Sequence, residues 1–170
     1  MELLIRSPME CDRDAVEKFV KSFDDEEFGI HGDCGFRSYD SFSHWLEAMR
    51  VTEVSDSDSW CEVKAFEFLC FDLESGELVG MMNIRPWLIF VLYCNGGNLS
   101  LSVKDSFRRK GVASEMIKYA IEFLRSKEVY RLIVTCSEDN IPSKKLINSM
   151  GGKELGRLNW NDKPIVRYII

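Results

Sequence analysis

The sequence predicts one α/β (α+β) domain built on a single sheet flanked by helices, and three observations carry this prediction. The chain has 170 residues, which suits one domain of roughly 150 residues and is too short for two. Hydrophobic residues make up 45% and charged residues 29%, a globular composition rather than a disordered or coiled-coil one. Hydrophobic spacing switches along the chain between the helical and the strand period, in the order expected of a layered α/β domain.

The N-terminal part begins with a short predicted strand over residues 2–6 and continues with two amphipathic helices. Residues 12–23 repeat apolar side chains at helical spacing. Residues 40–49 do the same, and Asp40 or Ser41 is expected to cap the helix.

The spacing then changes to that of strands. Residues 65–72 and 77–84 are β-rich runs around a Glu-Ser-Gly-Glu turn, which predicts a hairpin. A Ser/Asp stretch over residues 55–59 is expected to form a solvated loop before it, and residues 86–93 a short helix after it.

The C-terminal half alternates strands and helices. Residues 98–103 alternate strictly, as a strand with one apolar face does, and residues 111–126 carry the clearest helical stripe. The remaining predicted elements are a strand over 130–135, a helix over 142–149 and two strands over 153–158 and 165–170.

The charge is unevenly distributed. The net charge of −6 disfavours a general nucleic-acid binder, because such domains usually carry a basic excess. Residues 1–85 carry 8 basic against 20 acidic side chains, and residues 86–170 carry 14 against 8. The basic half is suited to an anionic ligand and the acidic half to a cationic one; the alternative is a solvated surface with segregated charges.

Composition also sets the expected compartment. The longest apolar run has eight residues, far below the ~20 of a membrane-spanning helix, and the first six residues lack the apolar core of a secretory signal. We therefore expect a soluble, cytoplasmic protein. The six cysteines form no CxxC pair, so free thiols are expected and a metal site is not.

The stretch that joins residues 98–103 to the long helix carries the strongest signal for a ligand. It contains Arg108, Arg109 and Lys110, followed by Gly111 at the start of the helix. A helix start presents unpaired backbone N–H groups and about half a positive charge, basic side chains add full charges, and a glycine allows close approach. These features predict an anion site suited to a pyrophosphate; the alternative is a basic helix cap without a ligand.

The same stretch, Arg108-x-x-Gly111-x-Ala113, resembles the acetyl-CoA-binding motif of the GNAT family of N-acetyltransferases. The resemblance covers most of residues 60–170 and, loosely, residues 32–46. It is closest to a subgroup of predicted bacterial acetyltransferases. The segments that carry this narrower resemblance are residues 83–85, 96–97, 135–136, 140–143, 151–152 and 167–168.

The resemblance implies a mixed, mostly antiparallel sheet in which two central parallel strands diverge, one over residues 99–103 and the other over 131–135. The gap leaves backbone groups unpaired, and the pantetheine amides of acetyl-CoA complete them as an added strand does. By this analogy pantetheine pairs with Leu101 and Val103, and acetyl-CoA serves as the acyl donor without a metal. The other implied cofactor-binding residues are Arg108, Arg109, Lys110, Gly111, Val112, Ala113, Ser114, Asn140 and Ser143.

The resemblance also implies direct attack of an acceptor amine on the thioester carbonyl. The site then supplies proximity, polarises the carbonyl and lets a proton leave the amine. Many family members place a tyrosine acid where this chain has Ile147, and the subgroup often has His at Asn98 and Gly at Ser100. The catalytic candidates that remain are Tyr168, Asn98 and Asn140.

Several candidates have a structural alternative. Tyr168 either reaches the thioester sulfur or packs in the core, and Asn140 either contacts a ligand or caps a helix. Asn83 and Arg85 share one face of a strand and are the acceptor-binding candidates; Arg85 either binds a substrate carboxylate or pairs with an acidic residue of the chain. Cys136 is expected to be a buried structural thiol, because no histidine lies near it in sequence.

The sequence thus predicts a single acetyltransferase domain over residues 1–170 that acetylates a primary amine of a small molecule or peptide in a ternary complex. The acidic half suits a polyamine, a lysine side chain or a cationic antibiotic alike. The main alternative is a catalytically degenerate member that binds acyl-CoA as a sensor or structural module. A nucleotide-binding regulatory domain is disfavoured, because no Gly-x-x-x-x-Gly-Lys-Ser/Thr pattern occurs. Neither nucleic acid nor a membrane is an expected partner, and both a monomer and a homodimer fit the sequence.

Overall fold

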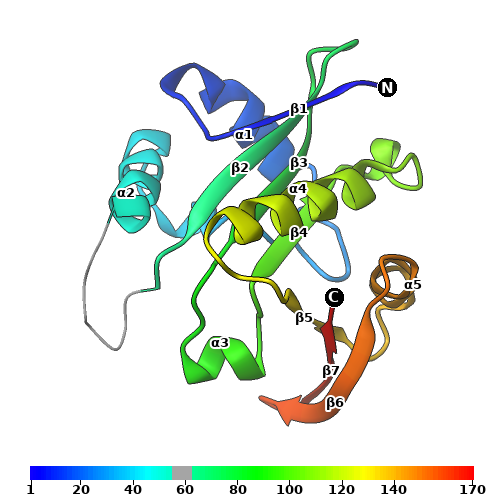
Figure 1. The fold of residues 1–170 in the computed structure, drawn as a ribbon. Helices are drawn as coiled ribbons and strands as arrows, with labels where there is room; N and C mark the ends of the chain where they lie inside the picture. The colour runs from blue at the N-terminus through cyan, green and yellow to red at the C-terminus, as the bar shows by residue number, and fades with distance from the viewer. Residues whose placement is uncertain (55–62) are drawn as a thin grey trace.

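The computed structural model describes residues 1–54 and 63–170 as two sheets covered by helices (Figure 1). A four-stranded antiparallel sheet has the order β1-β2-β3-β4, and a three-stranded antiparallel sheet has the order β5-β7-β6. The strands are β1 (Leu3–Arg6), β2 (Phe66–Asp72), β3 (Leu78–Ile84), β4 (Leu99–Val103), β5 (Ile133–Ser137), β6 (Lys153–Trp160) and β7 (Lys163–Ile169). The α-helices are α1 (Arg13–Lys21), α2 (Phe42–Val54), α3 (Phe90–Cys94), α4 (Val112–Ser126) and α5 (Ile141–Ser149). Among the described residues, no helix is long and apolar enough to span a bilayer.

The predicted helices and strands are confirmed, and the differences lie at their ends. The strand predicted from residue 130 begins at Ile133, because Tyr130 is 75% exposed and still belongs to the connection from α4. The last two strands are longer than predicted, because a two-residue turn at Asn161 and Asp162 joins them. Both turn residues have positive φ, which Asn and Asp tolerate. The loop predicted at residues 55–59 lies outside the described residues.

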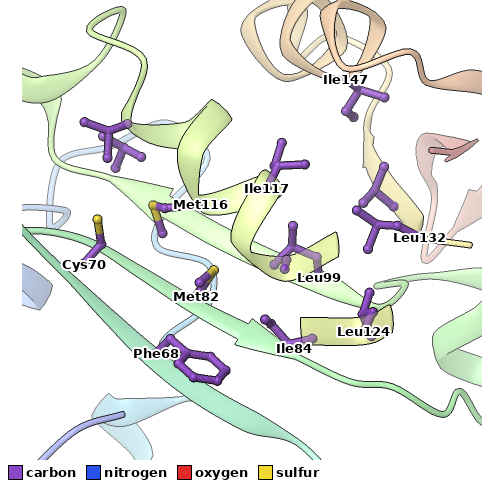
Figure 2. Close-up of a cluster of buried hydrophobic side chains, with 14 of the residues drawn as sticks. Phe68, Cys70, Met82, Ile84, Leu99, Met116, Ile117, Leu124, Leu132 and Ile147 are labelled. Carbon is purple, nitrogen blue, oxygen red and sulfur yellow. The ribbon is translucent and has the colours of Figure 1, made fainter. Parts of the chain in front are cut away.

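The first hydrophobic core lies between α4 and one face of the four-stranded sheet (Figure 2). The apolar stripe of α4 packs on alternate residues of β2 and β3, and the core continues to the second sheet and to α5. Its labelled members are Phe68, Cys70, Met82, Ile84, Leu99, Met116, Ile117, Leu124, Leu132 and Ile147. This core fixes the position of α4 relative to both sheets.

The second core lies on the opposite face of the same sheet, under α1 and α2 (Figure 1). Phe19 and Trp45 from the helices pack toward Leu69 and Met81 of the strands. The four-stranded sheet is therefore buried on both faces, which explains why every residue of β3 is buried and why its sequence does not alternate between apolar and polar residues.

The two sheets meet at Asn98, which is buried and hydrogen-bonded on all sides. Its backbone N–H donates to the carbonyl of Ile133 (2.7 Å), and its side-chain oxygen accepts from the Ile133 N–H (2.8 Å). Its side-chain amide donates to the carbonyls of Arg85 (2.7 Å) and Pro86 (3.3 Å). The preceding Gly97 has φ of 69°, and a Cβ there would lie 2.3 Å from the Ile133 carbonyl oxygen. Only glycine allows this approach.

Beyond this joint β4 and β5 separate, so the expected single sheet is divided into two. The described residues form no ladder between them; the one bridge, Gly97 to Val134, is antiparallel. The Asn98 side chain occupies the Ile133 N–H that a neighbouring strand would otherwise engage, which ends the pairing at this point. The expected divergence is thus present, and it takes the form of two separate sheets.

A buried polar network crosses the second face of the four-stranded sheet. Glu67 of β2 is fully buried, and one of its carboxyl oxygens, Oε2, accepts from the Asn83 amide (3.3 Å). The Asn83 side-chain oxygen in turn accepts from Arg85 (3.0 Å), and Arg85 also donates to the Ser100 hydroxyl on β4 (2.7 Å). The other carboxyl oxygen of Glu67 has no hydrogen-bond partner among the described residues. Burial raises the pKa of Glu67 well above its usual value, and contacts with Cys34 and Asn83 oppose the rise only in part.

We expect Asn98→Ala to lower the free energy of unfolding by at least about 2 kcal/mol. The change leaves the Ile133 N–H and the carbonyls of Arg85 and Pro86 without their partner, and each such buried group costs about 1–3 kcal/mol. Urea denaturation measures the effect. The control is Asn148→Ala at an exposed position of α5, expected within about 0.5 kcal/mol of wild type. Equal free energies of unfolding of the two variants would contradict the stabilising role of the Asn98 hydrogen bonds.

We expect Glu67→Gln to stabilise the protein more at about pH 8.5 than at about pH 5. Since the folded-state pKa of Glu67 is raised, its contribution to stability is fully present below the unfolded pKa and is lost as pH rises through the folded pKa. Glutamine stays neutral and removes that loss. Thermal melts of both proteins at the two pH values provide the measurement, and the same difference in melting temperature at both would disprove the assignment.

Candidate functional site

The opening between the two sheets is bordered by two unpaired strand edges. β4 is the last strand of its sheet and β5 the first of the other, so within residues 1–54 and 63–170 each has one edge without a neighbouring strand. The opening is closed at one end by the Asn98 joint. The loop that leads from β4 to α4 and the start of α5 lie at its other end (Figure 1). The free edges of β4 and β5 can hydrogen-bond to an extended chain of amides that lies in the opening between them.

The loop before α4 presents backbone N–H groups, as predicted. Gly111 caps the helix in a left-handed conformation (φ 88°), has no side chain to occupy the cap, and has open space where a Cβ would stand. The first helical hydrogen bond is donated by Glu115 to the Gly111 carbonyl, so the N–H groups of Val112, Ala113 and Ser114 point out of the helix end without a helical acceptor. This end can bind an anion.

Arg108 faces away from this helix end, although the sequence places it among the basic residues of the loop. Its guanidinium binds Glu26 (2.9 and 3.1 Å) and Asp105 (3.3 Å), and its Nε donates to the carbonyl of Val103 (3.0 Å). Arg108 therefore fastens the loop to the N-terminal part of the chain. It also occupies the carbonyl of Val103, a residue whose backbone was expected to pair with pantetheine.

Arg109 instead lines an open groove of about 560 Å³ together with Lys145 and the apolar side chains of Ile141 and Pro142. Arg109 has φ of 59°, a conformation that costs a non-glycine residue about 1–2 kcal/mol. Such strain is frequent at ligand sites. The groove joins the start of α4 to the start of α5 and has two cations on its walls, which suits a molecule with several phosphates and an apolar body.

Asn140 and Ser143 shape the start of α5. The Asn140 side chain accepts from the Ser143 N–H (3.0 Å), so Asn140 is the N-cap of the helix. The Ser143 hydroxyl lies beside the half-buried Cys136 thiol on β5, where burial raises the pKa of the thiol. Both predicted residues therefore border the opening, with Asn140 in the capping role.

Tyr168 lies in the core, on β7 between Val134 and Glu154. It is 3% exposed, burial raises its pKa, and its hydroxyl makes no hydrogen bond to any described residue. Ile147, at the position of the family's tyrosine, is buried in the same core. The geometry favours a packing role for Tyr168.

Asn83 and Arg85 are brought together on the opposite side of β4 from the helix end. Leu99 and Val103 of β4 belong to the core under α4, whereas Ser100 lies on the other face, where Arg85 binds it. Among the described residues Arg85 forms no direct ion pair; its guanidinium donates hydrogen bonds to the Gly97 carbonyl (3.0 Å), to Asn83 and to Ser100.

The segment between α1 and α2 covers this face. The His31 N–H donates to the Ser102 hydroxyl (2.8 Å), and Gly32 lies so close that a Cβ would stand 2.6 Å from the Ser100 carbonyl oxygen. The carbonyl of Asp33 accepts from the Trp45 indole of α2 (2.9 Å). The acidic half of the chain thus forms one wall beside Arg85.

Sequence reasoning missed two residues of this region. Glu67 looks like an ordinary solvent-facing residue of a predicted strand, and Glu26 belongs to an acidic run that looks like a solvated loop. A weak signal was available for Glu67, since it interrupts an otherwise apolar run in which the surrounding positions on both strand faces are hydrophobic.

Comparison with known proteins agrees with this geometry. The profile of the Acetyltransferase (GNAT) family matches residues 20–151. A ribosomal-protein alanine acetyltransferase from Vibrio fischeri superposes with a TM-score of 0.73 at 11% identity, over 99% of this chain and 92% of that one. A proposed acetyltransferase from Salmonella typhimurium, solved with its cofactor acetyl-CoA, superposes with a TM-score of 0.65 at 14% identity, over 99% of this chain and 92% of that one. A spermidine N-acetyltransferase chimera containing Vibrio cholerae sequence superposes with a TM-score of 0.65 at 15% identity, over 100% of this chain and 95% of that one.

At these identities the structural matches show the shared fold, and a search of curated protein sequences found no significant match. The family profile spans more than half of the chain. This match shows that the chain belongs to the GNAT family of acetyltransferases, in agreement with the open strand edges and the exposed N–H groups at the start of α4.

Proposed function

We propose that the protein transfers an acetyl group from acetyl-CoA to a primary amine, by direct attack of the amine in a ternary complex. The observation that carries the proposal is the opening between β4 and β5, which is closed at Asn98 and flanked by the start of α4, where backbone N–H groups have no helical acceptor. An extended amide chain fits between two free strand edges, and an anion fits the helix end. Acetyl-CoA has both parts in one molecule.

Different residues of the site bind different parts of acetyl-CoA. The N–H groups of Val112, Ala113 and Ser114 bind the pyrophosphate, and Arg109 and Lys145 supply positive charge along the groove. The free edge of β4 around Leu101 pairs with the pantetheine amides. The thioester is then held near Asn98. We propose that Asn98 contributes to catalysis by holding the ends of β4 and β5 in place beside the thioester.

The acceptor enters from the other face of β4, where Asn83 and Arg85 lie and the acidic N-terminal half forms the wall. Negative charge attracts a protonated amine, and the amine attacks after losing its proton. The structural matches include one protein that acts on a ribosomal protein and one that acts on spermidine, so a peptide amine and a polyamine are the two acceptor classes to test first.

A panel of amines tests the proposal. Polyamines, lysine side chains and peptide N-termini are each incubated with acetyl-CoA, and release of the CoA thiol and the acetylated product are measured. Turnover of one class supports the proposal. Binding of acetyl-CoA without turnover of any amine favours the second candidate, an acyl-CoA-binding module, which the burial of Ile147 and Tyr168 in the core supports.

Gly111→Asp is expected to weaken CoA binding at least tenfold, about 1.4 kcal/mol, because it adds a side chain and a negative charge at the anion-binding helix end. Isothermal calorimetry measures the affinity. The matched control is Gly76→Asp in the β2–β3 turn, which also has positive φ (69°) and open space at the Cβ position. Unchanged affinity in a folded Gly111→Asp protein would contradict the assignment of the donor site.

Turnover at subsaturating acceptor is expected to rise from about pH 7 to about pH 9 in both wild type and Tyr168→Phe. The free amine has a pKa near ~10.4, and only its neutral form has a lone pair to attack with. Because the Tyr168 hydroxyl makes no hydrogen bond to the described residues, its removal is expected to cost less than ~10²-fold. A loss beyond ~10³-fold with unchanged CoA affinity would instead identify Tyr168 as the acid.

A further inference from the structure

The hydroxyl of Ser100 is held by a charged donor and keeps its own proton free. Arg85 donates to it from Nη2 over 2.7 Å. The same guanidinium is fixed on its other sides by the Gly97 carbonyl and the Asn83 side chain, each at 3.0 Å. Since the Ser100 oxygen accepts from Arg85, its O–H is left to donate, and no described residue accepts from it.

A neighbouring positive charge strengthens this donor. Hydrogen bonds polarise one another along a chain, and a bond from an ionised donor is roughly twice as strong as a neutral one. The Ser100 hydroxyl therefore combines a fixed position, a free proton and a cation behind its oxygen. This combination stabilises a negatively charged oxygen that lies within hydrogen-bond distance of the hydroxyl.

Ser100 also lies at the correct end of β4. The anion-binding Gly111 follows the C-terminal end of the strand, and Asn98 closes its N-terminal end. β4 has five residues, so an extended arm that runs back along its free edge from the helix end covers about 17 Å. It ends beside residues 98–101. The Ser100 side chain faces the acceptor side of the strand at that end.

We propose that the Ser100 hydroxyl, oriented and polarised by Arg85, donates a hydrogen bond to the thioester carbonyl oxygen of acetyl-CoA. This proposal rests on the proposed function. The amine nitrogen forms a bond to the carbonyl carbon while negative charge builds on the carbonyl oxygen, where Ser100 donates. The carbon–sulfur bond then breaks, the thiolate leaves with the electron pair, and the nitrogen gives one proton to solvent. Ser100 ends the reaction with its own proton.

This role suits a chain without the family's tyrosine. Ile147 offers no proton at that position, but a thiol with a pKa near ~8.5 leaves as thiolate without strong acid assistance. The larger demand is the charge on the carbonyl oxygen, and removal of one donor to such an oxygen costs ~10²–10³-fold in kcat. Ser100 meets that demand through hydrogen bonding alone.

The test compares Ser100→Ala, Ser100→Thr and Ser102→Ala. Ser102 lies on the same face of the same strand and contacts the His31 N–H, so it is the matched control. For each protein we measure kcat, the affinity for acetyl-CoA, the melting temperature, and the infrared stretch of the isotope-labelled thioester carbonyl of bound acetyl-CoA. A purely structural role of Ser100 moves the melting temperature and the affinity but not the carbonyl frequency.

We expect Ser100→Ala to lose about 10- to 10³-fold in kcat with acetyl-CoA affinity within about twofold of wild type. Its bound carbonyl is expected to absorb at higher frequency than in wild type, because a hydrogen bond to the oxygen is lost. Ser100→Thr, which keeps the hydroxyl, and Ser102→Ala retain both wild-type values. If Ser100→Ala does not fold, Ser100→Cys, with similar volume and a weak donor, replaces it.

An unchanged kcat or an unchanged carbonyl frequency in the Ser100 variant would overturn the proposal, as would an equal loss in Ser102→Ala. Failure of the wild-type protein to bind acetyl-CoA is a separate result. It overturns the proposed function, and this proposal with it, before any variant is compared.

Discussion

The hydrogen bonds of Asn98 are the constraint on which the rest of the site depends. One side chain joins the end of β3, the start of β4 and the start of β5, and the close approach of Gly97 brings the backbones together. The same contacts end the strand pairing, so β4 and β5 separate immediately beyond them. Contacts that join the two sheets at one end and separate at the other leave β4 and β5 with one free edge each among the described residues.

β4 then separates two chemical environments. Its residues Leu99 and Val103 face the core under α4, on the same side as the start of that helix. Ser100 and Ser102 face the segment between α1 and α2. A donor and an acceptor can therefore approach one strand from opposite sides and meet at its edge. Under the proposed function, this arrangement would provide proximity, because each side of the strand would orient one reactant.

The uneven charge of the sequence has two consequences in the fold. Part of it is neutralised across the structure, since Arg108 binds Glu26 and Lys104 binds Glu77. These ion pairs attach the basic loop to the acidic half and fix its position. The rest stays local: Arg109 and Lys145 remain on the groove between α4 and α5. Charge counts predicted an anionic ligand on the basic half, but only the fold shows which cations face the groove and which hold the loop.

The sequence by itself determined the elements, their order and the helix start at Gly111 with its exposed N–H groups, because hydrophobic period and the Arg-x-x-Gly-x-Ala turn are local properties of the chain. Tertiary structure decided the rest. Arg108 turned to Glu26, Glu67 became buried beside Asn83, and Ser100 acquired its guanidinium partner from Arg85. Each of these contacts joins residues from different strands or from distant segments. Its energy depends on burial and on partners that only the packed sheet brings together, so the local sequence does not identify those partners.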